Sequence, residues 1–161
     1  MIGLLLTLVT TIVLVLLARQ DIRERMIFTF PIIVLHLIWS AYLLLSNAWS
    51  ASFLIIFWSI HLVIYVIFNQ CNLWGRGDSD VFLLFSNLCL YSVHAVSGYA
   101  LAIRECVYLC FGLMLSMAIG FIENKIRHKE VKLNGEIAVV PGITLVMICL
   151  MLQGICWRGM E

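Results

Sequence analysis

The chain has 161 residues, of which 63% are hydrophobic and only 12% are charged, and its net charge is +1. A soluble domain has about 45–50% apolar and about 25% charged residues, so this composition excludes a soluble globular domain, a disordered chain and a nucleic-acid-binding module. Apolar runs close to 20 residues long predict an all-α, polytopic membrane bundle, and the alternation typical of membrane strands is absent.

Six apolar runs predict six membrane-spanning helices in a single domain covering residues 1–161. The predicted spans are residues 2–18, 26–45, 51–68, 81–96, 106–121 and 137–157. The first run has no basic segment before it and no small-residue cleavage site after it, so we expect a retained helix rather than a signal peptide. No Asp, Glu, Lys or Arg is expected in the middle of a span.

The basic residues predict the orientation of these spans, because cytoplasmic loops are enriched in Lys and Arg. Eight of the ten basic residues follow spans one, three and five, whereas only Arg104 and Arg158 fall on the other side. The eight are Arg19, Arg23, Arg25, Arg76, Lys125, Arg127, Lys129 and Lys132. We therefore expect both termini to lie outside the cytoplasm.

The three aspartates of the chain, Asp21, Asp78 and Asp80, all fall on the predicted cytoplasmic side, after the first span and before the fourth. Two carboxyl groups a few ångströms apart share one proton, because both cannot ionise together. Such a pair can activate a water molecule with its ionised member and protonate a carbonyl oxygen with the other. The alternative, judged from spacing alone, is that they are ordinary loop charges beside helices.

Two segments carry a family resemblance. Residues 21–29 (DIRERMIFT) resemble the D-x-R-x-R-x-I-P-N signature of type IV prepilin peptidases, which are GxGD-type intramembrane aspartyl proteases. Residues 75–84 (GRGDSDVFLL) resemble the G-x-G-x-G-D-x-K-L-L signature of the same family, and residues 136–142 are more weakly similar to the start of its last span. The length and six-span pattern are similar to those of the short, peptidase-only members.

The resemblance implies specific catalytic residues. Asp21 matches the first catalytic aspartate. Asp80 is the preferred second one, because that alignment also matches the glycines before it and the leucines after it, while a literal G-x-G-D match makes Asp78 the alternative. Gly75, Gly77, Ser79 and Arg23 are then supporting or substrate-binding residues.

Two further expectations concern these supporting positions. Asp78 or Ser79 is expected to cap the fourth helix, whose positive end would lower the pKa of an aspartate there. Arg23 is expected either to anchor the membrane boundary, to steady Asp21 or to meet lipid headgroups.

Departures from the family pattern support a second hypothesis. Phe82 stands where the family has lysine, Ser79 stands where it has glycine, and Phe28 and Thr29 replace a Pro-Asn pair. The chain could therefore be a catalytically degenerate homologue that acts as a non-enzymatic assembly component of a pilus or secretion system. A small transporter is a third, weaker alternative.

The remaining expectations concern partners. The resemblance implies cleavage of the basic leader from a type IV prepilin or pseudopilin precursor, at the cytoplasmic face of a bacterial inner membrane, with membrane lipid as the surroundings and no nucleic acid. The insertion carrying the family's methyltransferase activity is absent, so methylation is not expected.

No metal site is expected. Six cysteines without a C-x-x-C pair predict neither a zinc site nor disulfides. His36, His61 and His94 are expected to be packing residues rather than metal ligands.

Overall fold

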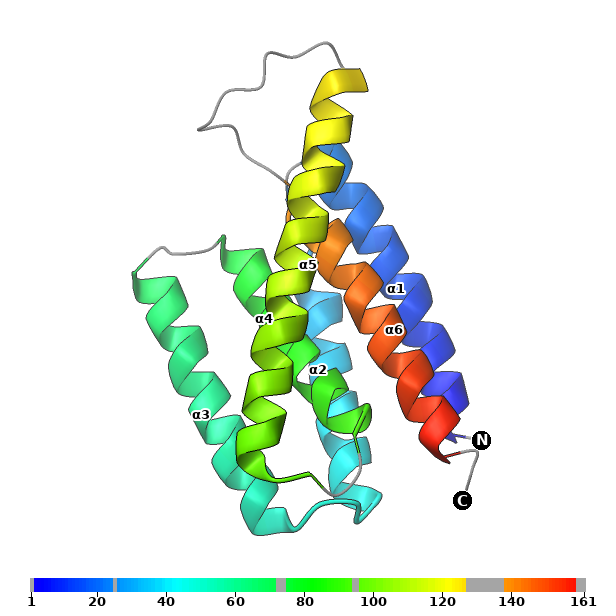
Figure 1. The fold of residues 1–161 in the computed structure, drawn as a ribbon, viewed down its shortest axis with the longest axis vertical. Coiled ribbons are helices and arrows are strands. Elements are labelled where there is room, and N and C mark those ends of the chain that lie inside the picture. Colours follow the sequence, from blue (N-terminus) through cyan, green and yellow to red (C-terminus); the bar gives the residue numbers. More distant parts are fainter. Residues whose placement is uncertain (1, 25, 72–74, 94–95, 127–137, 159–161) are drawn as a thin grey trace.

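A computed structural model describes residues 2–24, 26–71, 75–93, 96–126 and 138–158. These residues form six helices and no strand, which confirms the all-helical fold class (Figure 1). The helices are α1 (Ile2–Glu24), α2 (Thr29–Leu45), α3 (Ala51–Gln70), α4 (Arg76–Tyr91), α5 (Gly98–Ile126) and α6 (Val140–Arg158). The start of α1 and the end of α6 lie at the same end of the bundle (Figure 1).

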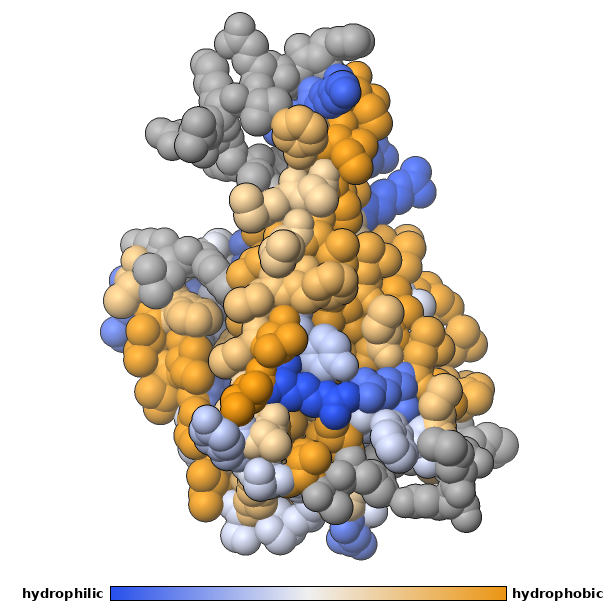
Figure 2. All heavy atoms as spheres, viewed as in Figure 1, coloured by the Kyte–Doolittle hydropathy of each residue, from blue (hydrophilic) through white to orange (hydrophobic). Residues whose placement is uncertain are grey.

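Four of the helices, α1, α3, α5 and α6, are long and apolar enough to cross a membrane, while α2 is apolar but shorter. Their outward surfaces carry large apolar side chains, including Leu8 on α1, Ile55 on α3 and Met114 on α5. Figure 2 shows one face of the molecule on which hydrophobic residues cover most of the surface. Such a surface is stable in lipid and costly in water, which supports a membrane protein.

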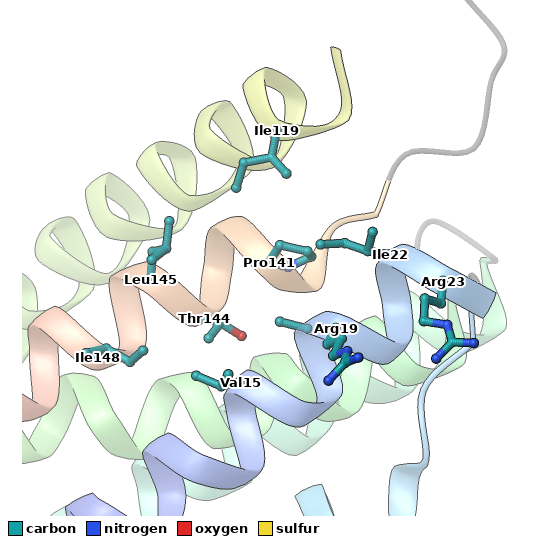
Figure 3. Close-up of a pocket in the computed structure, with 10 residues that line it drawn as sticks. Val15, Arg19, Ile22, Arg23, Ile119, Pro141, Thr144, Leu145 and Ile148 are labelled. Atoms are coloured by element: carbon teal, nitrogen blue, oxygen red, sulfur yellow. The ribbon is translucent and has the colours of Figure 1, made fainter. Parts of the chain in front are cut away.

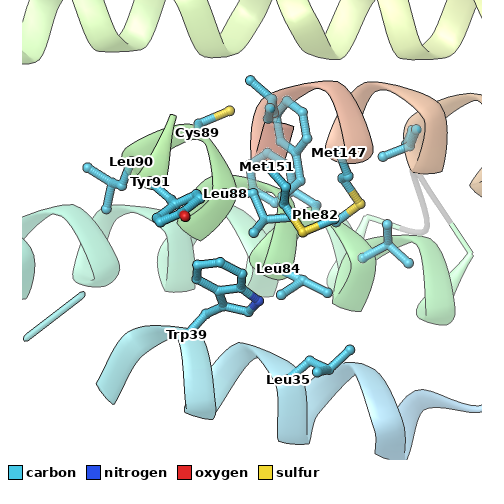
Figure 4. Close-up of a cluster of buried hydrophobic side chains, with 14 of the residues drawn as sticks. Leu35, Trp39, Phe82, Leu84, Leu88, Cys89, Leu90, Tyr91, Met147 and Met151 are labelled. Carbon is cyan, nitrogen blue, oxygen red and sulfur yellow. The ribbon is translucent and has the colours of Figure 1, made fainter. Parts of the chain in front are cut away.

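The fourth predicted span is the one the structure changes most. Helix α4 ends at Tyr91 instead of continuing to residue 96, and its 16 residues make it roughly 24 Å long, shorter than a bilayer core of about 30 Å. It packs against α2, α3 and α6, which enclose it (Figure 1). Its apolar side chains, such as Leu84 and Leu88, lie in the central cluster with Trp39 and Met147 (Figure 4). Helix α4 is therefore the buried axis of the bundle.

Buried polar residues mark α4 as an internal helix. Asn87 is fully buried and accepts a hydrogen bond at Oδ1 from Trp58 Nε1 at 2.8 Å. Its amide nitrogen donates to the His36 backbone oxygen at 3.1 Å and to Ser40 Oγ at 2.9 Å. Inside a membrane such a group must find protein partners, so this network fastens α2 and α3 to α4.

Helix α5 is longer than the fifth predicted span, because it begins at Gly98 rather than near residue 106. Arg104 and Glu105 consequently lie within the helix, and Glu105 is buried. Its Oε1 atom lies 2.8 Å from Nε2 of His61, near the middle of α3. The prediction placed Glu105 before the fifth span, whereas it is a buried residue of α5, and a basic partner on the facing helix offsets the cost of burying it.

The close crossing of α5 and α6 fixes the start of α6. A Cβ atom at Gly142 would lie 2.3 Å from the Ser116 backbone nitrogen and 2.4 Å from the Gly112 oxygen, so only glycine fits there. Ser116 Oγ also lies within hydrogen-bond distance of the Val139 oxygen. Small residues let two helix backbones approach in this way, and here they hold the first turn of α6 firmly against α5.

Candidate functional site

Asp21 is a buried residue of α1 rather than a loop residue. The helix continues beyond the apolar run to Glu24, so Asp21 extends a buried stripe with 3–4 spacing. The members of this stripe are Thr7, Thr10, Leu14, Leu17 and Asp21. This spacing places one side chain per turn on the same helix face. The Asp21 side chain therefore points into the bundle, and the residue is only 6% exposed.

The first turn of α6 supplies a partner for Asp21. The backbone N–H of Val140, the first residue of α6, donates to Asp21 Oδ2 at 3.1 Å. The N–H groups at a helix start have no acceptor within the helix, and the helix dipole is positive there. This contact therefore suits a negatively charged carboxylate at Asp21.

The start of α4 differs from the expected cap. The N-cap residue is Gly75, not Asp78 or Ser79. Asp78 is the third residue of the helix, and its carboxyl group accepts a hydrogen bond from the Gly75 backbone N–H, as the third residue does in a capping box. Ser79 is buried, and its hydroxyl group donates back to the Gly75 oxygen at 3.4 Å.

Asp78 interacts electrostatically with Asp21. Burial and then the Asp21 charge raise the pKa of Asp78 to about 6, and together they outweigh the opposing effect of the Gly75 N–H. The expectation that the helix start would lower the pKa of an aspartate there is therefore wrong for Asp78. The hydrogen bond from the helix start lowers the pKa by less than the loss of solvent and the nearby negative charge raise it. At neutral pH such a group readily exchanges a proton.

Asp80 lies deeper in the bundle than Asp78. It is 3% exposed, and Tyr65 of α3 donates a hydrogen bond from its hydroxyl group to Asp80 Oδ1 at 3.0 Å. Two residues along a helix correspond to a rotation of about 200°, so Asp78 and Asp80 leave α4 in different directions. The two candidate aspartates therefore have different surroundings, although both lie near the same helix start.

The other motif positions are explained by packing. A Cβ atom at Gly77 would lie 2.7 Å from the Ile27 side chain, so glycine lets the segment between α1 and α2 approach α4. Gly75 is exposed. Phe82, at the lysine position of the family motif, is buried with its ring 5.6 Å from His61 and 5.7 Å from Phe68. A lysine there would bury its charge in an aromatic cluster. In this chain the side chain at that position is instead part of the hydrophobic core.

Arg23 lies in the last turn of α1 and is exposed. It lines an outer groove between α1 and α6, away from the Asp21 side of the helix. Arg25 and residues 127–137, which include most of the predicted basic loop and Glu136, lie outside the described residues, as does His94. Among the described residues, no group of three or more His, Cys, Asp and Glu side chains is arranged to hold a metal ion.

Four features of the structure were not predicted: the inward orientation of Asp21, its donor at Val140, the Tyr65 donor to Asp80, and the contact of His61 with Glu105. The 3–4 spacing of residues 7, 10, 14, 17 and 21 could have shown that Asp21 points into the bundle. Tyr65 and the Val140 N–H gave no such signal, since one lies inside an apolar run and the other is backbone. The pairing of His61 with Glu105 also needed the fold, because the two residues are 44 positions apart.

The site thus joins the ends of three helices: Asp21 from α1, Asp78 and Asp80 from α4, and a backbone donor from α6. Buried carboxyl groups that sense each other's charge are suited to acid–base chemistry on a polar bond. No protein-family model matches the chain, and neither a curated protein nor a solved structure matches it.

Proposed function

We propose that this protein is a membrane aspartic endopeptidase that removes the basic leader from type IV pilin-like precursors at the cytoplasmic face of a bacterial inner membrane. The observation that carries the proposal is that the end of α1 and the start of α4 meet: Gly77 lies against Ile27, and Asp21 is buried where its charge acts on Asp78. The two sequence segments with family resemblance therefore lie together at one end of the bundle.

In the proposed reaction, Asp21 acts as the ionised member of the pair. The Val140 N–H stabilises its negative charge, and the carboxylate takes a proton from a water molecule. The aspartate from α4 is the protonated member and donates its proton to the oxygen of the scissile carbonyl. The water oxygen bonds to the carbonyl carbon and gives a diol. Asp21 then passes the proton that it took from water to the leaving nitrogen, and the α4 aspartate takes a proton back from a diol hydroxyl group as the carbon–nitrogen bond breaks to give an acid and an amine.

Two observations bear on which α4 aspartate takes part. The motif spacing and the deep burial of Asp80 favour Asp80, whose carboxyl group is oriented by Tyr65. The coupling to Asp21 and the pKa of about 6 favour Asp78, because a general acid works best with a pKa near the ambient pH. Separate substitutions decide between them.

The test is co-expression of the full chain with a prepilin-like substrate in cells without another prepilin peptidase. Leader removal is followed by the shift in substrate size. We expect the wild-type chain to cleave and Asp21→Asn to abolish cleavage. Asp78→Asn and Asp80→Asn identify the second member, which is the one whose loss abolishes cleavage while the protein still accumulates in the membrane.

Glu24→Gln serves as the matched control, because it neutralises an exposed acid in the last turn of α1. Cleavage that survives Asp21→Asn, or that survives both α4 substitutions, contradicts the aspartate pair. Absence of cleavage by a well-expressed wild-type chain favours the non-catalytic assembly role instead. The burial of Phe82 at the lysine position is the observation that supports this second role.

A further inference from the structure

An apolar groove runs along the outside of the bundle beside the aspartate end (Figure 3). It lies between α1 and α6, with α5 contributing Ile119, and its volume is about 410 Å³. Val15 on α1 and Leu145 and Ile148 on α6 form its apolar wall. Since four of the helices are membrane-spanning candidates, this groove opens toward the lipid rather than toward the interior site.

Two cationic side chains stand at one end of the groove. Arg19 and Arg23 are spaced one turn apart on α1 and both are exposed (Figure 3). Within the described part of the chain, no ion pair or hydrogen bond engages either guanidinium group. The neighbouring acid Glu24 instead accepts a hydrogen bond from Gln20. Both arginines are therefore available to an anion at the mouth of the groove.

Thr144 provides a second, independent indication of a ligand. It lines the groove and is 3% exposed, yet its Oγ1 atom has no hydrogen-bond partner in the described residues. A threonine inside a helix ordinarily donates to the backbone oxygen four residues earlier, which here would be that of Val140. A buried hydroxyl group without a partner is costly, so a ligand acceptor at this position would be stabilising.

We propose that this groove binds one anionic phospholipid. The phosphate group lies against Arg19 and Arg23, an ester carbonyl accepts a hydrogen bond from Thr144, and an acyl chain follows Val15, Leu145 and Ile148. This order of charged, polar and apolar groups along the groove matches the order of groups along a lipid.

The surroundings favour a lipid over a peptide helix. The groove is open on the outside of a bundle whose helices are candidate membrane spans, so lipid is the molecule that faces it. The charge at the groove mouth also selects an anionic headgroup over a zwitterionic one.

The test measures lipid binding to the purified full chain by native mass spectrometry, with phosphatidylglycerol and phosphatidylcholine as probes. We expect phosphatidylglycerol to bind more tightly. Arg19→Gln and Arg23→Gln should each weaken its binding by about 5-fold, and the double variant by about 30-fold. Lys125→Gln is the matched control, because it removes an exposed cation from the last turn of α5 without touching the groove.

Two further variants test the groove itself. Leu145→Trp fills it and should reduce phosphatidylglycerol binding with both arginines intact, while Leu152→Trp on the exposed surface of α6 should not. Thr144→Val keeps the side-chain shape and should weaken binding by about 5-fold.

Each part of the proposed lipid site has a result that would overturn it. Equal binding of the two lipids, or phosphatidylglycerol binding unaffected by the double arginine variant, overturns the anionic site. Binding unaffected by Leu145→Trp overturns the groove as its location, and binding unaffected by Thr144→Val overturns the ester contact. An apolar helical peptide that binds where phosphatidylglycerol does not would replace the lipid with a helix as the occupant.

Discussion

The bundle buries carboxyl groups in two regions, and the two regions treat them differently. In the middle of the bundle, Glu105 of α5 faces the ring of His61 of α3, so an acid meets a base. At the end formed by α1, α4 and α6, Asp21 is coupled to another acid, Asp78. Val140 and Tyr65 provide neutral donors to Asp21 and Asp80 in this second region.

The His61–Glu105 pair is internally balanced. His61 Nδ1 lies 2.8 Å from the Phe57 backbone oxygen, which can only accept, so Nδ1 carries a proton. Whether the proton between Nε2 and Glu105 sits on the ring or on the carboxyl group, the pair is neutral overall. Such a pair can be buried in a membrane at moderate cost and ties α3 to α5.

The aspartate end differs from this pair, because there one acid acts on another acid. Acids that share a site raise each other's pKa, as Asp21 does for Asp78. The proposed function gives the central pair a structural role and the aspartate end a chemical role, and the following substitutions test this contrast.

The largest effect on cleavage is expected for Asp21→Asn, and the same acid-to-amide change at Glu105 serves as its comparison. Asp21→Asn should lower leader cleavage by about 10³-fold or more, because one member of the proposed acid–base pair is lost. Glu105→Gln should leave cleavage per folded molecule nearly unchanged. The measurement is the rate of leader release normalised to folded protein, and equal effects of the two changes would contradict the contrast.

Breaking the central pair should mainly affect stability. Glu105→Leu leaves His61 buried without its partner and should lower the free energy of unfolding by about 3–5 kcal/mol. The double variant His61→Leu and Glu105→Leu should recover much of this loss. Unfolding in detergent followed by circular dichroism checks both, and a double variant as unstable as the sum of the single ones would rule out their pairing.

The crossing of α5 and α6 should be similarly sensitive, because it positions the Val140 donor. Gly142→Ala places a methyl group against the Ser116 and Gly112 backbones, so we expect a loss of about 1–3 kcal/mol in stability together with reduced cleavage. Gly98→Ala is the control, since its nearest contact would be Phe53 at 3.7 Å. An unchanged melting temperature for Gly142→Ala would contradict the close crossing.

The raised pKa of Asp78 predicts a pH dependence. The folded protein holds a proton on Asp78 up to about pH 6, whereas the unfolded chain releases it near its ordinary value of 3.8. The contribution of Asp78 to stability is therefore full below about pH 4 and is lost as the pH rises toward 6. The difference in unfolding free energy between wild type and Asp78→Asn, measured from pH 4 to 7, should show this slope.

A second variant identifies the cause of that slope. Asp21→Asn removes the negative charge beside Asp78, so the slope should shift to lower pH. Identical pH profiles for the wild type and Asp78→Asn would show that the pKa of Asp78 is not raised, and a slope that stays at the same pH in Asp21→Asn would show that the two aspartates are not coupled.

The smallest effect is expected for Tyr65→Phe, which removes the hydroxyl group that donates a hydrogen bond to Asp80. We expect a loss of about 1 kcal/mol in stability. A change in cleavage much larger than the change in stability would assign the catalytic role to Asp80, because the hydroxyl group would then orient a reacting carboxyl group. The readout is the ratio of the two effects in the same membrane preparation.

Much of the fold could be predicted from the sequence, because apolar runs report directly on helices that meet lipid. The runs located α2, α3 and α6 to within three residues, and α1 except for its last six residues. They failed at α4, where a buried helix needs no full span, and at α5, where Glu105 interrupts the run although the helix continues. In both places a tertiary partner replaces lipid as the surroundings of the helix.

The candidate site was predictable in its residues but not in its contacts. The aspartates are few and their motifs are local, so Asp21, Asp78 and Asp80 could be named from the sequence. The N-cap at Gly75 and the raised pKa of Asp78 depend on burial and on Asp21, which is far along the chain. The partners Tyr65 and Val140 follow only from how α3 and α6 pack.

The most direct test of the central claim uses the purified full chain in phosphatidylglycerol-containing vesicles with a synthetic peptide that joins a basic leader to an apolar helix. Mass spectrometry of the products reports the bond that is cut. We predict a single cut at the leader junction by the wild type and none by Asp21→Asn at equal folded concentration. Equal cleavage by the two proteins would contradict the aspartate pair.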